Sequence, residues 1–102
     1  FARTLTSNGN GTDHAWGGNV LVMGGKVKGQ DIYGSYPSLA LDTDMEIGGG
    51  VIIPQISTDE YFAELALWYG IPSSDLALLF PNIGNFYNTM SGEAPIGFMD
   101  LN

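Results

Sequence analysis

One stretch near the middle of the chain constrains the fold most, because it carries both a start signal and a stop signal for a helix. The letters STDE have the form of a capping box, in which the Ser57 side chain caps the first turn and Glu60 reaches back to the cap. Gly70 suits the position that follows a helix end, and Pro72 prevents the helix from continuing. These signals predict a helix over residues 58–69.

Apolar side chains recur in this segment at helical spacing. Tyr61, Leu65 and Trp68 follow the i, i+4, i+7 pattern of an amphipathic helix. We expect the aromatic stripe of this segment to pack in a core rather than to form a binding platform, and its members are Tyr61, Phe62, Trp68 and Tyr69. A second, shorter helix is predicted from Ser74 or the next residue to Phe80, because a proline follows.

The remaining apolar segments are short and are separated by glycine. Glycine makes up 15 of the 102 residues, and only 14% of the residues are charged. Short strands are predicted at residues 20–23, 26–28 and 96–99, and residues 51–53 form a further apolar run. The chain is therefore expected to be a loop-rich piece of a larger fold, an α/β fragment with short strands, one clear helix at about 58–69 and long glycine-rich loops. The alternative is an all-β, cross-β (amyloid-like) filament, since apolar and nearly uncharged windows such as 20–23 stack readily.

The chain is strongly acidic. It has 11 acidic and 3 basic residues, which gives a formal net charge of −8. This charge repels phosphate backbones, so nucleic acid is not an expected partner, and it favours divalent cations instead. The absence of cysteine excludes disulfides and thiolate metal sites. No apolar run approaches the roughly 20 residues that a membrane-spanning helix needs, so no membrane span is predicted.

The single histidine of the chain lies beside a carboxylate in the loop TSNGNGTDHAWGGN. Asp13 and His14 are candidate metal ligands or acid/base groups, in a loop whose glycine and asparagine residues leave room for a cation. The competing interpretation is an exposed loop histidine beside an aspartate that caps a turn. A zinc site needs three or four ligands, so a site at this pair would take its further ligands from elsewhere.

Three acidic side chains, Asp42, Asp44 and Glu46, occupy alternate positions. An extended segment would place all three on one face. The simpler interpretation is a solvated strand face, and the alternative is weak calcium binding through the carboxylate oxygens. The spacing resembles the start of an EF-hand loop but lacks the glycine at the sixth position and the glutamate at the twelfth.

Several blocks of the chain together resemble one known family. The blocks are TSNGNGTDHAWGGN, GGKVKGQDIYG and the helix sequence DEYFAELALWYG, and the resemblance extends over about residues 1–86. They are similar to the C-terminal third of proteins with the domain of unknown function 1501 (DUF1501), in the alkaline phosphatase/sulfatase-like superfamily. The family usually has Phe-Gly-Arg where this chain has Phe1-Ala2-Arg3. Because the chain opens without an initiator methionine and the resemblance is to the C-terminal third, we expect residues 1–102 to be a single C-terminal fragment of a larger domain.

The resemblance carries expectations about location, fold and chemistry. It implies a bacterial protein that is exported, usually through a twin-arginine signal, to the periplasm or the cell exterior. It also implies an α/β sandwich around a metal-dependent hydrolytic centre, in which an Asp/His pair on a loop after a core strand contributes to the metal site. By that analogy Asp13 and His14 are the metal ligands here, while the nucleophile and the other ligands lie upstream. The metal is left open among zinc, manganese and calcium.

Two functions are expected from these features. The first is a C-terminal fragment of an exported, metal-dependent phosphatase/sulfatase-like protein, which is non-catalytic alone and self-assembles as a subunit of an extracellular fibril. Its partner would then be other copies of itself, with calcium between the stacked carboxylates of Asp42, Asp44 and Glu46. The alternative is part of an active metal-dependent hydrolase whose remaining site residues lie upstream.

Overall fold

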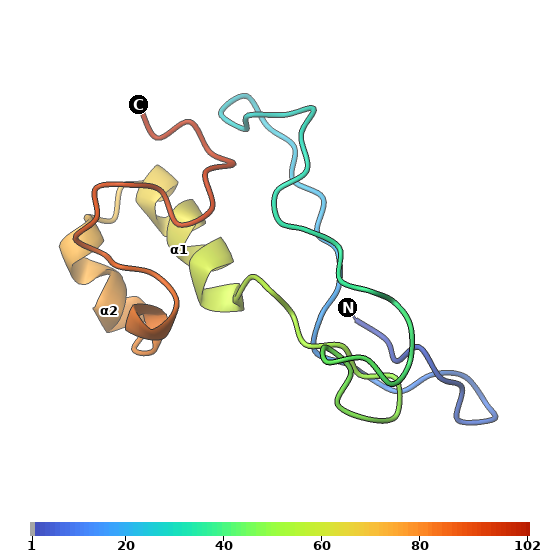
Figure 1. The fold of residues 1–102 in the computed structure, drawn as a ribbon. Coiled ribbons are helices and arrows are strands. Elements are labelled where there is room, and N and C mark those ends of the chain that lie inside the picture. Colours follow the sequence, from blue (N-terminus) through green and yellow to red (C-terminus); the bar gives the residue numbers. More distant parts are fainter. Residues whose placement is uncertain (1) are drawn as a thin grey trace. The chain divides into compact units, whose positions relative to one another are not determined.

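The structure of the chain is a computed structural model that describes residues 2–102, so the phenylalanine of the Phe-Ala-Arg departure lies outside the described residues. The chain divides into two compact units, which are described separately. Unit 1 consists of the chain up to Leu21 together with Ser35–Gln55, and unit 2 consists of Val22–Gly34 and Ile56–Asn102. The helices of the described residues all lie in unit 2 (Figure 1).

The longest helix, α1 (Thr58–Tyr69), forms where the capping signals predict it. The Ser57 hydroxyl accepts the backbone N–H of Glu60 at 3.1 Å, and the Glu60 carboxylate accepts the backbone N–H of Ser57 at 2.8 Å. At the other end Gly70 adopts a left-handed conformation with a φ of 107°, which a residue without a Cβ reaches at little cost. The predicted helix over residues 58–69 is therefore confirmed with both of its caps.

A short helical segment follows α1 and completes a small core. It consists of the 3₁₀ turn η1 (Ser73–Asp75), the helix α2 (Leu76–Leu79) and the 3₁₀ turn η2 (Ile83–Asn85). Almost wholly buried side chains pack together between these elements, namely Ala63, Leu76 and Ile83. The predicted second helix is confirmed in place, although its first turn is 3₁₀ and its last helical residue precedes Phe80.

The aromatic side chains of α1 do not all pack in this core. The ring of Tyr61 stacks on that of Phe98, with the centroids 5.6 Å apart. Phe62, Trp68 and Tyr69, by contrast, are exposed, so the expectation of a packed aromatic stripe is wrong for these three residues. The core forms instead against the face of α1 that carries small side chains, because alanine at positions 63 and 66 lets the following turns approach the helix closely.

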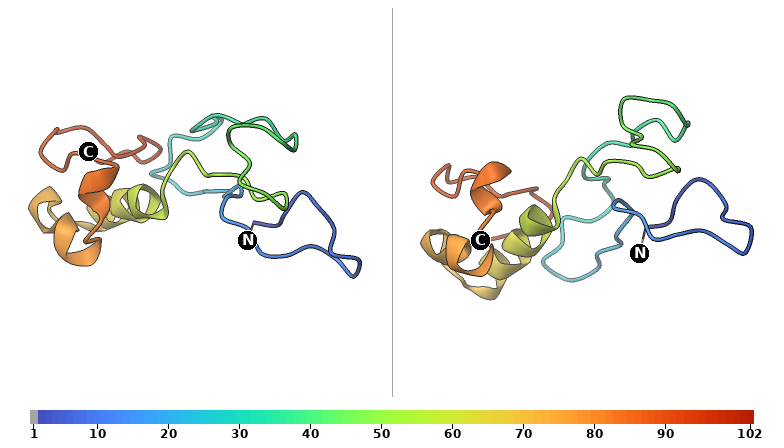
Figure 2. Two further views of the ribbon diagram at one scale, coloured as in Figure 1. Left: turned by 60° about the horizontal axis from the view of Figure 1, so that its bottom comes forward. Right: turned by 90° about the horizontal axis from the view of Figure 1, so that it is seen from below.

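Residues 2–102 contain no sheet and are mostly helix and coil, as the further views in Figure 2 also show. The strand-like pairings within them are isolated bridges, which join Arg3 to His14, Val27 to Met99 and Glu46 to Ile52. Residues 20–23 show why strands fail to form. Leu21 and Met23 are each 82% exposed, and no backbone–backbone hydrogen bond joins this run to the rest of the described chain. A lone extended segment has no neighbour to pair its backbone groups or cover its side chains. The predicted α/β fragment with short strands is therefore wrong, and so is the alternative of a cross-β filament.

Unit 1 is held by backbone contacts between turns. The N–H of Leu5 donates to the Gly50 carbonyl at 2.9 Å, and the N–H of Ile53 donates to the Met45 carbonyl at 2.8 Å. Gly50 is buried and has a φ of 77°, and a Cβ at this position would lie 2.6 Å from the Thr6 nitrogen. The close approach of these two turns therefore requires glycine at position 50.

The helices are short. α1 has 12 residues, whereas a helix needs about 20 apolar residues to cross a bilayer. In the part of the chain that the structure describes, no helix is long and apolar enough to span a membrane, in agreement with the sequence.

Candidate functional site

Backbone pairing with the start of the chain fixes the base of the loop that carries Asp13 and His14. Arg3 and His14 form an antiparallel bridge, and backbone hydrogen bonds of 3.1 Å flank it on both sides, one of them from the Thr4 N–H to the Asp13 carbonyl. The Thr4 hydroxyl also accepts the N–H of Asp13 at 3.2 Å. The position of both candidate ligands is therefore set by contacts with residues about ten positions earlier.

The tip of this loop orients the Asp13 carboxylate. The Asn8 side chain donates from Nδ2 to Asp13 Oδ1 at 2.8 Å, and its Oδ1 accepts the N–H of Asn10 at 3.0 Å. The backbone N–H of Asn8 closes the turn on the Gly11 carbonyl at 2.9 Å. One asparagine thus builds the turn and holds the carboxylate. The repeated Asn-Gly letters predict the turn, but nothing in them predicts the contact with Asp13.

The two candidate ligands are both exposed. Within residues 2–102, no hydrogen bond reaches Asp13 Oδ2 or the imidazole of His14. Successive side chains of an extended segment point to opposite faces, so we expect His14 to share a face with its bridge partner Arg3, and Asp13 to lie on the other. The Arg3 guanidinium donates to the Thr12 carbonyl at 2.7 Å and so stays close to this loop. The pair therefore lies exposed on one loop, and its two side chains are expected on opposite faces of the segment.

The three alternating carboxylates do not line a strand. Residues 42–46 bend and turn, and Asp42 has a φ of 58°. Glu46 is engaged by its own loop, since Oε1 accepts two N–H groups of the triple glycine at 2.9 and 2.7 Å and Oε2 accepts the N–H of Asp42 at 3.3 Å. The expected strand face is wrong because Glu46 closes a turn, and calcium binding by Asp42, Asp44 and Glu46 stays a prediction. Across residues 2–102, no three histidine or acidic side chains are arranged to hold a metal ion.

A buried carboxylate lies in unit 2, where the sequence had not singled out a site. Glu64 of α1 is 0% exposed and accepts the backbone N–H groups of Ile96, Gly97 and Met99 at 2.6 to 2.7 Å. Its signal in the sequence is a glutamate inside the apolar run of α1, with no basic residue after Lys28 to pair with it. A buried glutamate needs a hydrogen-bonding or charged partner. Here the partners are backbone N–H groups, which every residue except proline has, so the sequence does not reveal them.

An exposed ion pair joins two distant segments of unit 2. Lys26 Nζ lies 3.1 Å from Asp100 Oδ2, and it also donates to the Asn102 carbonyl at 2.7 Å. The hydrogen bond from Lys26, supported by a backbone hydrogen bond at Asn102 and by the lysine charge, lowers the pKa of Asp100 below its ordinary value. Both side chains are largely exposed, so solvent screens the pair and its contribution to stability is small.

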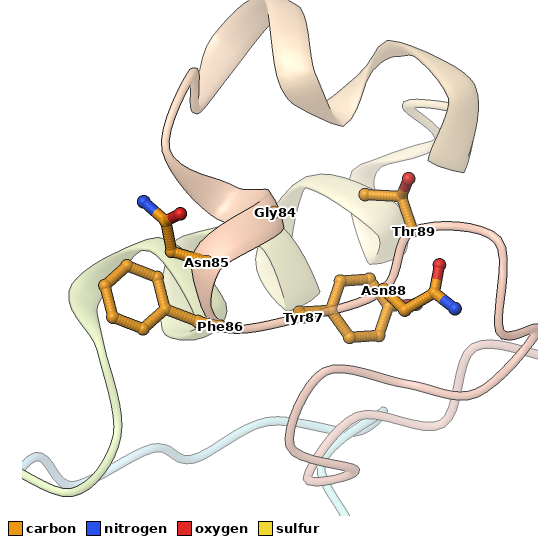
Figure 3. Close-up of a pocket in the computed structure, with 6 residues that line it drawn as sticks. All are labelled: Gly84, Asn85, Phe86, Tyr87, Asn88 and Thr89. Carbon is orange, nitrogen blue, oxygen red and sulfur yellow. The ribbon is translucent and has the colours of Figure 1, made fainter.

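A surface hollow of about 340 Å³ lies along the segment that follows η2 (Figure 3). It is lined by Gly84, Asn85, Phe86, Tyr87, Asn88 and Thr89. These residues offer amides, two hydroxyls and aromatic rings, and the Tyr87 hydroxyl donates to the Glu93 carbonyl. Because the lining has no carboxylate, imidazole or amine, the hollow lacks the groups of a hydrolytic or metal centre.

Comparison with known proteins gives one match. No curated protein and no solved structure matches the chain. The model of a family described as Protein of unknown function (DUF1501) matches residues 1–48, the segment that contains Asp13, His14 and the three acidic residues. This match supports the DUF1501 family for the chain.

Proposed function

We propose that the loop of residues 3–14 supplies half of a divalent-metal site in an exported phosphatase/sulfatase-like hydrolase, of which this chain forms a C-terminal part. Asp13 and His14 are the candidate ligands of this chain, and because their side chains are expected on opposite faces of the segment, zinc titration of variants at each position decides which of them contacts the metal. The observation that carries the proposal is the orientation of the Asp13 carboxylate by Asn8 at 2.8 Å on a loop whose base is closed by backbone pairing. The DUF1501 match over residues 1–48, which include this loop, supports it, and the export and superfamily assignments rest on the resemblance alone.

The donor set has the chemistry of such a site. A carboxylate oxygen and an imidazole nitrogen are ligands for zinc and manganese, and both side chains are accessible on the loop. A divalent metal bound there would polarise a phosphoryl or sulfuryl oxygen and stabilise the developing charge. The chain itself orients the carboxylate through Asn8 and places Arg3, a cation suited to an ester anion, beside His14.

The chain alone is not expected to catalyse. A catalytic zinc site uses three protein ligands and a water, and this loop supplies two candidates. The further ligands and the nucleophile would come from protein beyond these 102 residues. Hydrolysis of a phosphate or sulfate ester by the purified chain would contradict this part of the proposal.

Titration of the full chain with zinc or manganese chloride tests the half-site. The NMR signals of the single imidazole report on His14 directly, and zinc is diamagnetic, so its titration gives shifts without broadening. We expect weak binding, with shifts at His14 and at the amides of residues 8–14. Asp13→Asn and His14→Gln should each weaken the response, and the larger loss identifies the principal ligand. Asp75→Asn, which removes an exposed carboxylate from unit 2, is the matched control.

Two results would contradict the metal proposal. Tight, stoichiometric binding by the chain would show a complete site rather than half of one. A response at neither His14 nor Asp13 up to a large excess of metal would exclude both residues as ligands.

A second candidate function is self-association in a form that is not cross-β. Many large apolar side chains are exposed in both units, among them Leu21, Ile32 and Leu78, each about 80% exposed. Where exposed apolar side chains gather into one patch, they mark contacts with other proteins, and self-association of this chain would cover them. The charge of −8 opposes contact between copies, so association should strengthen as salt is added. Sedimentation of a single monomeric species at all concentrations and salt levels would exclude this candidate.

A further inference from the structure

The carboxylate of Glu64 is held by one short segment of the chain. Oε2 accepts the N–H groups of Ile96 and Gly97 at 2.7 and 2.6 Å, and Oε1 accepts that of Met99 at 2.6 Å. Among the described residues, Lys26–Asp100 forms an ion pair, whereas Glu64 forms none. The three N–H groups therefore replace the water that a charged carboxylate loses on burial.

The backbone around Gly97 is shaped to surround an anion. Gly97 has a φ of 97°, a left-handed conformation that turns neighbouring N–H groups toward one point. A Cβ built on Gly97 has no atom within 4 Å, so glycine is needed here for its backbone conformation and not for space. Residues 96–100, which we call the strap, thus form a backbone nest whose occupant is a side chain of α1.

The opposite edge of the strap holds a second segment of unit 2. The Phe98 carbonyl accepts the N–H of Lys28 at 2.8 Å, and the N–H of Asp100 donates to the Lys26 carbonyl at 2.7 Å. The Phe98 ring contacts Tyr33 edge-on with a centroid distance of 6.2 Å. The strap, drawn in red beside α1 in Figure 1, therefore connects α1 to residues 26–33.

The helical core is formed without residues of the strap, so we expect it to remain when the strap opens. The cluster of Ala63, Leu76 and Ile83 is drawn from α1, α2 and η2, and the buried strap residues Phe98 and Met99 lie outside it. Loss of the strap would leave these core contacts in place.

We propose that Glu64 is a latch that closes the strap on α1, and that the strap and residues 26–28 open and close together while the helical core stays folded. Three hydrogen bonds converge on one charged group, so this side chain fixes the strap on α1 together with the stacking of Phe98 on Tyr61. Glu64 acts here as a positioning residue. The strap and residues 26–28 form a local unit whose opening can be detected by hydrogen exchange.

Amide hydrogen exchange of the full chain, resolved by NMR, tests the latch with two variants that act from opposite sides. Glu64→Gln keeps the shape but removes the charge, and it should speed exchange at Ile96, Gly97, Met99 and Lys28 by about tenfold or more, as expected for loss of a charged hydrogen bond. Gly97→Ala leaves the sequence of α1 unchanged but places a Cβ on a residue with a φ of 97°, which strains the nest. It should therefore speed exchange at the same amides. Amides in the last turn of α1 should stay protected in both variants. Glu93→Gln, at an exposed carboxylate, is the matched control and should change none of them.

Rescue by a free carboxylate distinguishes the effect of the negative charge of Glu64 from the effect of its side-chain volume. In Glu64→Ala the nest loses its occupant, and sodium formate should restore protection at the strap amides while sodium chloride at equal ionic strength should not. Three results would overturn the latch: strap amides as protected in Glu64→Gln as in the parent chain, equal loss of protection in the strap and in α1, or a strap that stays closed in Gly97→Ala. If Glu64→Gln does not fold, the latch is wrong as a local device, because the helical core would then depend on the carboxylate.

Discussion

The two units of the molecule are stabilised in different ways. Among the described residues, the buried apolar side chains all belong to unit 2, where Leu76 and Ile83 are central. The buried positions of unit 1 are Thr4 and Gly50, which contribute a hydroxyl and backbone. Unit 2 therefore has a core of its own, whereas unit 1 is a set of turns tied by hydrogen bonds.

The segment that matches the family model is not the segment that contains the buried core. The DUF1501 match covers residues 1–48, which include the loop of Asp13 and His14, and it ends before α1. The segment that supports the family is thus the one with the least burial, and it exposes apolar residues such as Trp16 and Leu21. The match to the family therefore lies in the segment with few buried side chains, and the buried apolar core lies in α1 and the residues that follow it.

The largest effect is expected in the core of unit 2. Leu76→Ala removes a fully buried side chain and should lower the free energy of unfolding of unit 2 by about 2–5 kcal/mol. Thermal unfolding followed by the helical circular dichroism signal measures this loss, and the Leu5 amide of unit 1 should keep its protection. Leu78→Ala, at a residue 81% exposed, should change stability by no more than about 0.5 kcal/mol. Equal loss of protection in both units would show that they unfold as one.

A backbone effect of intermediate size is expected in unit 1. Gly50→Ala combines a left-handed conformation with a Cβ only 2.6 Å from the Thr6 nitrogen, so the contact between Leu5 and position 50 should open at a cost of about 2–3 kcal/mol. Gly49→Ala has a φ of 64° but no atom within 4 Å of the new Cβ, so it should cost only about 1 kcal/mol. Exchange of the Leu5 amide measures both, and equal effects would contradict the role of the close approach.

A smaller effect is expected at the cap of α1. Ser57→Ala removes the hydroxyl that accepts the Glu60 N–H and should destabilise the helix by about 1 kcal/mol. Thermal unfolding measures the change, with Ser73→Ala in the exposed 3₁₀ turn as a control of the same chemistry. A cap variant as stable as this control would mean that the capping box contributes nothing in the folded chain.

The smallest effect concerns the exposed ion pair. Lys26 lowers the pKa of Asp100 in the folded chain, so the pair stabilises the fold above the pKa of the unfolded chain, and this contribution is lost as the pH falls through the folded pKa. Lys26→Met should raise the pKa of Asp100 toward its ordinary value in an NMR titration. Lys28→Met removes an equal charge two residues away and should leave the pKa of Asp100 mostly lowered. An equal rise of this pKa in both variants would show that the hydrogen bond from Lys26 is not its specific cause.

The sequence predicts local structure well where a signal is complete within a few residues. Ser57, Glu60 and Gly70 define α1 from cap to cap, because each signal concerns hydrogen bonds within one turn. The predicted strands fail for the opposite reason. The run 20–23 has the composition of a buried strand, but strand formation requires a neighbour that the described chain does not provide.

The site is predictable only in part for a similar reason. Asp13 and His14 stand out by residue type, and their loop is indicated by Asn-Gly turns. The contact from Asn8 and the pairing of His14 with Arg3 depend on how the loop closes, which no spacing rule specifies. Glu64 could not be assigned at all, since its partners are backbone N–H groups more than thirty residues away.

Native-state hydrogen exchange across the full chain tests the contrast between the two units most directly. The predicted result is slow exchange in α1 and at Ile96, Gly97 and Met99, with residues 16–23 exchanging as fast as an unstructured peptide. Slow exchange at residues 20–23 in the isolated chain would contradict it, because it would show that this run is paired and that the N-terminal region has a fold of its own.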